Sequence, residues 1–159
     1  MVAKIKDKTG IVMTGTFVFL GLAVVLIVLL LIQSVRIRQF KVDVFVLCNE
    51  SNICVAEGPD GKVKVHDDNL PAIYTLLQKS HGKAIFDSPA AEDSLTLSFD
   101  CHDEKWTMAI DKISDDIVRM SLSGPKEKTM YFKNNGSYDS YARAVSLAGY
   151  NAKNKALGH

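Results

Sequence analysis

Cys101 and His102 are an adjacent pair whose side chains could carry out a reaction. A thiol beside an imidazole can form a nucleophile if the two side chains meet in space and a third group orients the ring. The sequence shows no residue that would orient the imidazole of His102. An enzyme is therefore an alternative and not the leading hypothesis.

Two short clusters contain residue types that bind metals, CHDE at residues 101–104 and HDD at residues 66–68. Adjacent residues of a strand point to opposite faces, so neither cluster alone can surround a metal ion. Both clusters lie where turns are expected, and carboxylates at turns are usually solvated. We expect no cofactor, and a metal-binding protein that uses His66, Cys101 and His102 is kept as an alternative.

Cys48 and Cys54 flank the predicted turn NESN. If they face each other across a five-residue hairpin loop, they can form a disulfide, which would indicate an oxidising compartment. The other interpretation is a pair of buried thiols, which are ordinary core residues. If Cys48 and Cys54 pair with each other, Cys101 is left over and is buried. Alternatively, Cys101 is the true partner of one of the other two.

The longest apolar stretch runs from Ile11 to Ile32, 22 residues without a charge, of which sixteen are Leu, Ile, Val or Phe. A helix of this length spans roughly 33 Å, close to the ~30 Å hydrocarbon core of a bilayer. No small-residue cleavage site follows it. The sequence predicts a transmembrane helix at residues 11–33 that is an uncleaved signal anchor, after a short basic cytoplasmic tail at residues 1–10.

Basic residues flank this segment on both sides and suggest contact with lipid headgroups at the two interfaces. They are Lys4, Lys6, Lys8, Arg36 and Arg38. The numbers of basic residues before and after the span are nearly equal, and the positive charge of the terminal amine favours a cytoplasmic N-terminus. We expect the N-terminus in the cytoplasm and the C-terminal domain outside it, in a bacterial inner membrane with the domain in the periplasm. No basic face stands out on the rest of the chain, which argues against nucleic-acid binding.

Small residues share one face of the predicted span, at Gly10, Thr14 and Gly21. Small side chains let helices approach closely in a membrane, so this face is a candidate for packing against a partner helix. The span contains no ionisable side chain, which argues against an ion or proton pathway through this helix alone.

Apolar and polar residues alternate soon after the membrane segment, as they do in half-buried strands. This alternation predicts a strand at residues 40–48 and a hairpin of residues 53–57 and 62–66 around the turn GPDG. If Glu57 pairs with Lys62, the apolar residues of the hairpin share one surface. A three-stranded meander is the simplest interpretation.

A helix is predicted at residues 67–82, with Asp68 or Asn69 as its cap, Pro71 in its first turn and Gly82 at its end. A second helix is predicted after Ser137, because its apolar residues follow a 3.6-residue period.

Four further strands lie between these helices, separated by polar, turn-prone breaks. Their inward residues form four sets, Leu95, Leu97 and Phe99, then Trp106, Met108 and Ile110, then Val118, Met120 and Leu122, then Met130 and Phe132. The sequence thus predicts an α+β fold. A single N-terminal transmembrane helix precedes a small antiparallel-sheet domain with two helices at residues 40–152, and residues 153–159 form a frayed tail.

The basic leader that ends at Gly10, the apolar helix after it and the antiparallel sheet resemble the pilin and pseudopilin class. The resemblance covers about the first 35 residues. It implies a subunit of a secretion or pilus machine whose mature chain starts at Ile11. Two features depart from the class. Pilins usually place Glu five residues after the processing glycine, where this chain has Gly15, and their first helix runs well past the apolar part, whereas strand-like sequence starts here near Phe40.

Phosphate-loop, HExxH, GxSxG and dinucleotide-binding patterns do not occur in the sequence. The leading hypothesis is therefore a non-enzymatic single-pass accessory or assembly subunit of a multiprotein membrane complex. Its expected partners are the lipid bilayer and other membrane protein subunits, and the sequence identifies no small-molecule substrate.

Overall fold

The computed structural model describes residues 3–58, 61–65, 70–85, 87–133 and 138–145, with the side chains of residues 3–15 and 58 left out. The chain divides into two compact units, Met1–Arg36 and Ile37–His159. The first is helical throughout its described part, and the second contains the sheet.

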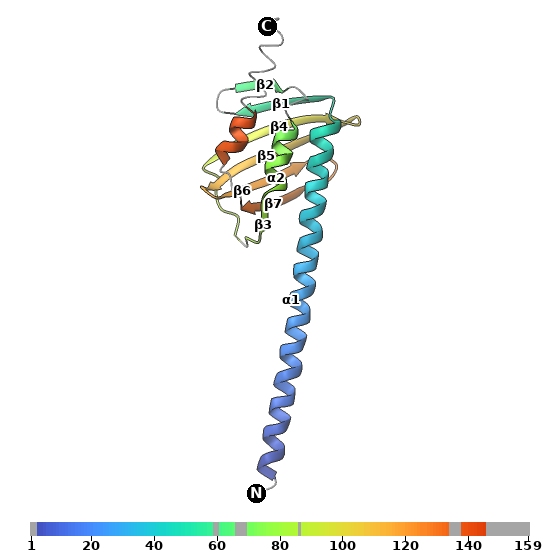
Figure 1. The fold of residues 1–159 in the computed structure, drawn as a ribbon, viewed down its shortest axis with the longest axis vertical. Helices are drawn as coiled ribbons and strands as arrows, with labels where there is room; N and C mark the ends of the chain where they lie inside the picture. The colour runs from blue at the N-terminus through green and yellow to red at the C-terminus, as the bar shows by residue number, and fades with distance from the viewer. Residues whose placement is uncertain (1–2, 59–60, 66–69, 86, 134–137, 146–159) are drawn as a thin grey trace, which may run out of the picture. The chain divides into compact units, whose positions relative to one another are not determined.

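The fold is α+β, as predicted. A long apolar helix comes first, and a seven-stranded antiparallel sheet with two further helices follows (Figure 1). The elements are α1 (Ala3–Glu50), β1 (Ile53–Gly58), β2 (Gly61–Val65), α2 (Pro71–Gln78), β3 (His81–Lys83), β4 (Asp93–Cys101), β5 (Glu104–Ser114), β6 (Ile117–Ser123), β7 (Lys128–Lys133) and a last helix at residues 138–145.

The first unit consists of the apolar part of α1. Its side chains from Phe17 to Ile32 are largely exposed, up to 74% for Phe19. By length and composition this helix can cross a membrane. The expectation of one N-terminal helix suited to membrane anchoring is confirmed to that extent.

The predicted strand at residues 40–48 is wrong, because α1 continues as a helix to Glu50. The buried residues of this stretch are Phe40, Val44, Leu47 and Cys48, whose spacing of four, three and one places them on one helical face. Val42 is 46% exposed and therefore does not share the core face, as a strand would require. The β-branched residues of this stretch fit the two-residue period of a strand and the 3.6-residue period of a helix. Packing against the sheet favours the helix.

The strands form a single antiparallel sheet in the order β2-β1-β4-β5-β6-β7-β3. The meander from β4 to β7 is confirmed, and so is the hairpin of β1 and β2, in which Glu57 pairs with Lys62 as predicted. The expected three-stranded meander is reduced to this hairpin because its first strand is helical. β1 instead pairs with β4, which joins both groups of strands into one sheet.

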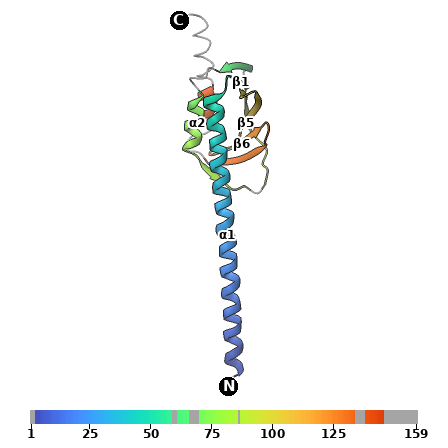
Figure 2. The same ribbon diagram turned by 90° about the vertical axis from the view of Figure 1, so that its right-hand side faces the viewer.

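One face of the sheet carries the core. The last part of α1, α2 and the helix at residues 138–145 all lie on this face (Figures 1 and 2). Inward residues of the central strands, such as Leu97, Met108 and Met120, are fully buried beneath them. The rings of Phe40 in α1 and Phe132 in β7 are 5.6 Å apart, so the end of α1 is part of this core.

The predicted helix at residues 67–82 is shorter in the structure, where α2 ends at Gln78 and Gly82 lies in strand β3. A Cβ at Gly82 would come within 2.2 Å of Cδ1 of Ile37, so the glycine allows α1 and β3 to approach closely. The proposed caps Asp68 and Asn69, and Ser137 before the last helix, lie outside the described residues.

Candidate functional site

The two-residue turn between β4 and β5 holds His102 and Asp103 in an unusual backbone conformation. Cys101 ends β4 and pairs with Glu104, which begins β5. His102 and Asp103 have φ angles of 52° and 64°, the left-handed values that tight hairpin turns require. Asn and Gly are the usual residues there, and other L-residues lose about 1–2 kcal/mol each. The turn fixes His102 at the tip of the hairpin despite this cost.

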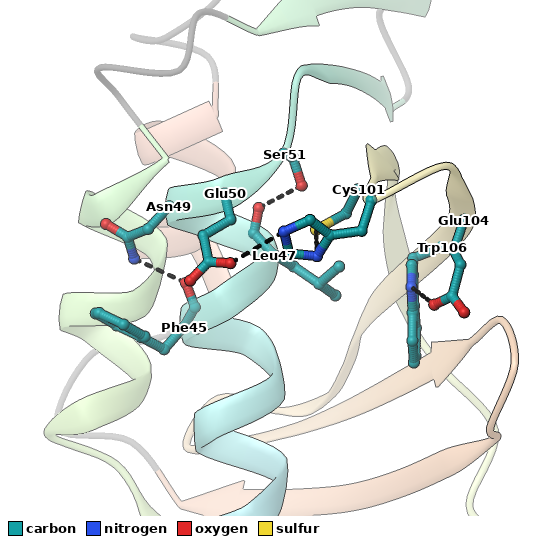
Figure 3. A network of polar contacts seen from close by, with 9 residues as sticks. Phe45, Leu47, Asn49, Glu50, Ser51, Cys101, Glu104 and Trp106 are labelled. Carbon is teal, nitrogen blue, oxygen red and sulfur yellow. Dashed lines mark hydrogen bonds and ion pairs between the residues drawn. The ribbon is translucent and has the colours of Figure 1, made fainter.

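The imidazole of His102 lies between the thiol of Cys101 and the carboxylate of Glu50, both of which are labelled in Figure 3. Its Nδ1 is 3.6 Å from Sγ of Cys101, and its Nε2 is 3.2 Å from Oε2 of Glu50, the last residue of α1. Because Glu50 orients the ring, the expectation that no residue would do so is wrong. No sequence signal indicates this contact, because Glu50 is far away in the chain and falls in a predicted turn.

This arrangement favours one tautomer of the imidazole. When Glu50 accepts a hydrogen bond from Nε2–H of the neutral ring, Nδ1 carries no proton and can accept one from the thiol. Cys101 is only 2% exposed, whereas the side chains of His102 and Glu50 are 66% and 48% exposed. A buried thiol thus lies beneath an exposed pair of titratable groups.

The end of α1 is fixed by side chains that bond to its last carbonyl groups. Ser51 Oγ donates to the carbonyl of Leu47 at 2.6 Å, and Asn49 Nδ2 donates to that of Phe45 at 2.7 Å. The Leu47 carbonyl is one of the last four, which a helix end leaves without an intrahelical partner, whereas the bond to Phe45 is a second one to a carbonyl further inside the helix. They hold the backbone on both sides of Glu50 in place.

The other side of the hairpin is tied by a separate contact. Trp106 Nε1 donates to Oε2 of Glu104 at 3.2 Å, and the ring of Trp106 lies against Gly124, where a Cβ would come within 2.8 Å of it (Figure 3). Glu104 is therefore engaged with Trp106, while Glu50 is the carboxylate paired with His102.

Of the two interpretations of Cys48 and Cys54, the structure has the buried thiols and not the disulfide. Both residues are buried in the thiol state, Cys48 in α1 and Cys54 in β1. The hairpin that was expected to place them opposite each other does not exist, because residues 40–50 are helical. Cys101 is the third buried thiol.

The alternative of a metal-binding protein gains no support from the part of the chain that the structure describes. Within it, no group of three or more His, Cys, Asp or Glu side chains is placed to hold a metal ion. His66 and its two neighbouring aspartates lie outside the described residues.

The residues predicted to contact membrane or partner helix all lie in α1. Gly21 faces open space, because a Cβ at this position would have no atom within 4 Å, and Arg36 and Arg38 are exposed. Gly10, Thr14, Lys4, Lys6 and Lys8 belong to the helix, but their side chains lie outside the described residues.

A second polar cluster, which no sequence pattern indicates, surrounds Asp111 on β5. This carboxylate is 7% exposed and accepts hydrogen bonds from Ser94 Oγ at 2.6 Å and Arg119 Nε at 2.7 Å. Arg119 also donates to the carbonyl of Pro89 at 3.0 Å. The hydrogen bond from Arg119 to Asp111 raises the pKa of the guanidinium above its usual value. The cluster ties the segment before β4 to the sheet, which is a structural role.

No protein-family model, curated protein or solved structure matches the chain. Its function must therefore be inferred from its own residues.

Proposed function

We propose that the chain is a non-enzymatic single-pass membrane subunit that docks other membrane proteins through its apolar helix and its α+β domain. The observation that supports this most strongly is that α1 contains both the apolar segment and a part of the domain core. Its charge-free part ends at Ile32, and Phe40, which follows after seven intervening residues, is fully buried in the domain. So short a stretch of chain keeps the domain close to the bilayer surface.

The apolar helix would contribute a surface for a partner helix. Gly21 has open space around its Cα, and close helix–helix contacts in membranes are made by such small residues. The lipid bilayer and other membrane subunits are thus the partners we propose.

The size of the protein extracted from its native membrane in mild detergents tests this proposal. We expect a particle larger than the monomer, and we expect Gly21→Leu to release the monomer by filling the packing face. Ala23→Leu is the matched control, because it adds volume about 200° around the helix and leaves that face unchanged. Migration of the unaltered protein as a monomer in several mild detergents contradicts the proposal.

We propose further that the N-terminus is cytoplasmic and that the domain lies outside the cytoplasm, in the periplasm of a bacterial inner membrane. The support is the basic leader at Lys4, Lys6 and Lys8, which is retained in the cytoplasm more easily than it is exported. Protease added to spheroplasts should degrade the domain, whereas protease added to inverted vesicles should leave it intact. The reverse pattern would place the domain in the cytoplasm.

A pilin-like or pseudopilin-like subunit is the second candidate. The length of α1 favours it, because the first helix of that class also runs past its apolar part, and here α1 continues to Glu50 and packs on an antiparallel sheet. Gly15 still departs from the class. Sequencing the N-terminus of the protein from its native membrane decides between the two, since a start at Ile11 supports this candidate and a retained leader excludes it.

A further inference from the structure

We propose that Cys101 is a modification site at which small disulfides form a mixed disulfide, with His102 as proton acceptor and Glu50 as the residue that positions it. This inference is independent of the proposed function, because it depends only on side chains at the β4–β5 turn and the end of α1.

The geometry satisfies what thiol activation needs. A nucleophile lies within hydrogen-bonding reach of a base, at 3.6 Å from Sγ of Cys101 to Nδ1 of His102. The base is oriented in turn by a third group, at 3.2 Å from Nε2 to Oε2 of Glu50. The tight turn between β4 and β5 places His102 directly after Cys101, at the end of the strand that carries the thiol.

A metal ion fits these side chains less well. With Nε2 engaged by Glu50, the pair offers only Sγ of Cys101 and Nδ1 of His102 as donors. Zinc sites in proteins have three or four protein ligands, and no third ligand joins them among the described residues.

The reaction balances without any further reagent. The thiol of Cys101 transfers its proton to Nδ1 of His102, and the thiolate attacks one sulfur of the small disulfide. A new S–S bond forms as the old one breaks, so the sulfur of Cys101 is oxidised and the departing sulfur is reduced. The departing thiolate then takes the proton from His102 and leaves as a thiol.

Access to the buried sulfur does not require unfolding. Cys101 is 2% exposed, but the neighbouring imidazole and its partner carboxylate are both largely in water. Ion pairs between exposed side chains are weak. A side-chain rotation of His102 that breaks this weak pair and leaves the backbone unchanged would therefore open a path to the sulfur, and the ring would return over Cys101 to accept the proton.

The full chain in detergent micelles, treated with oxidised glutathione at pH 7, provides the test. Trypsin separates Cys101, in the peptide of residues 84–105, from Cys48 and Cys54, which share the peptide of residues 42–62. Mass spectrometry then gives the rate of mixed-disulfide formation for each peptide. We expect the peptide of residues 84–105 to react at least about tenfold faster than the other, whose cysteines are equally buried.

Two substitutions of His102 examine the proton acceptor. His102→Asn removes the imidazole and suits the left-handed backbone, and we expect it to slow the reaction of Cys101 about tenfold or more. His102→Gly also suits this backbone and leaves a space, so added imidazole should restore part of the rate. A purely structural role of His102 would not give this rescue.

Glu50→Gln examines the positioning residue, and we expect a smaller decrease in rate than for His102→Asn. Its matched control is Glu104→Gln, which removes the same charge close to His102, but from a side chain that contacts Trp106 and not His102. Circular dichroism reports whether each variant keeps its fold, because Glu104→Gln itself changes the surroundings of Trp106.

Two results would overturn the proposal. One is a rate at Cys101 no higher than that of the cysteines at residues 42–62. The other is a faster reaction in His102→Asn, because the imidazole would then be a cover over the thiol and not its proton acceptor.

Discussion

His102 and Asp103 show how two residues in one turn meet different demands. Both have positive φ angles, but only His102 contacts the thiol and the carboxylate. The conformation of Asp103 thus serves the turn, and its side chain is exchangeable. Of these two turn residues, only His102 belongs to the site.

Asp103→Gly should therefore stabilise the protein. Glycine adopts this backbone without strain, and the gain of about 1–2 kcal/mol is partly offset by the larger entropy of the unfolded chain. We expect the free energy of unfolding to rise by about 0.5–1 kcal/mol, measured by urea denaturation. Asp115→Gly, at the β5–β6 turn where the described backbone is not left-handed, should not stabilise. Equal gains from both variants would contradict this explanation.

Tyr138 should make the stability of the domain sensitive to alkaline pH. Burial raises the pKa of this phenol to about 12, and the carboxylates of Asp93 and Asp111 act in the same direction. Since the folded pKa lies above the unfolded value of ~10, stability present below pH 10 is lost as the pH rises toward 12.

The measurement is the free energy of unfolding by urea between pH 9 and 12. Tyr138→Phe should show a shallower decline than the unaltered chain over this range, because it lacks the titrating hydroxyl. Identical slopes in the two proteins would mean that another group causes the decline.

At the scale of elements, the alternation of β4 to β7 could be predicted because one face of these strands packs on the core and the other is polar. The β1–β2 register followed from the turn GPDG. By contrast, β3 has three exposed residues and carries no hydrophobic signal, so the sequence predicted a helix end there. The prediction for residues 40–50 was wrong because their valines fit a strand and a helix equally well.

The candidate site could be predicted only in part. Adjacent residues such as Cys101 and His102 are visible in any sequence, and the break between strands was expected there. Glu50 could not be found, because its contact with His102 depends on where α1 ends relative to the sheet. Patterns of neighbouring residues do not predict contacts between residues that are far apart in the sequence.

Gly82 provides a test of the contact between α1 and β3. Gly82→Val would drive a side chain into Ile37, and overpacking of this kind costs about 1–3 kcal/mol. The neighbouring Lys83→Val introduces the same residue at an exposed position of the same strand and should be nearly neutral. Thermal unfolding of both variants gives the comparison.

A double variant identifies the cause. In Ile37→Ala with Gly82→Val, the smaller residue makes room for the valine, so the combined loss should be smaller than the sum of the single losses. Simple additivity would show that the two positions do not interact.

At the scale of the whole molecule, the boundary of the domain differs from the end of the apolar segment by only a few residues. The unit Ile37–His159 contains the last part of α1. Lys41 Nζ donates to the carbonyls of Gln78 and Ser80, and Asp43 pairs with Lys128, so this part is bonded to α2 and β7.

A chain that begins at Ile37 should therefore fold as a water-soluble domain with a cooperative thermal transition. A chain that begins at Ser51 lacks Phe40, Val44 and Leu47, each of which contributes about 2–5 kcal/mol when buried, and it should aggregate or remain unfolded. A stably folded chain from Ser51 would show that the helix is dispensable for the core.

The ion pair between Asp43 and Lys128 joins residues 85 positions apart, and the Phe40–Phe132 contact is of similar span. During synthesis, the end of α1 leaves the ribosome long before the strand that covers it. We therefore expect its apolar stripe to be exposed until β7 has emerged, which makes the incomplete chain prone to aggregate. Contacts between residues so far apart in the sequence form slowly, so we expect the packing of α1 onto β7 to be a late step in folding.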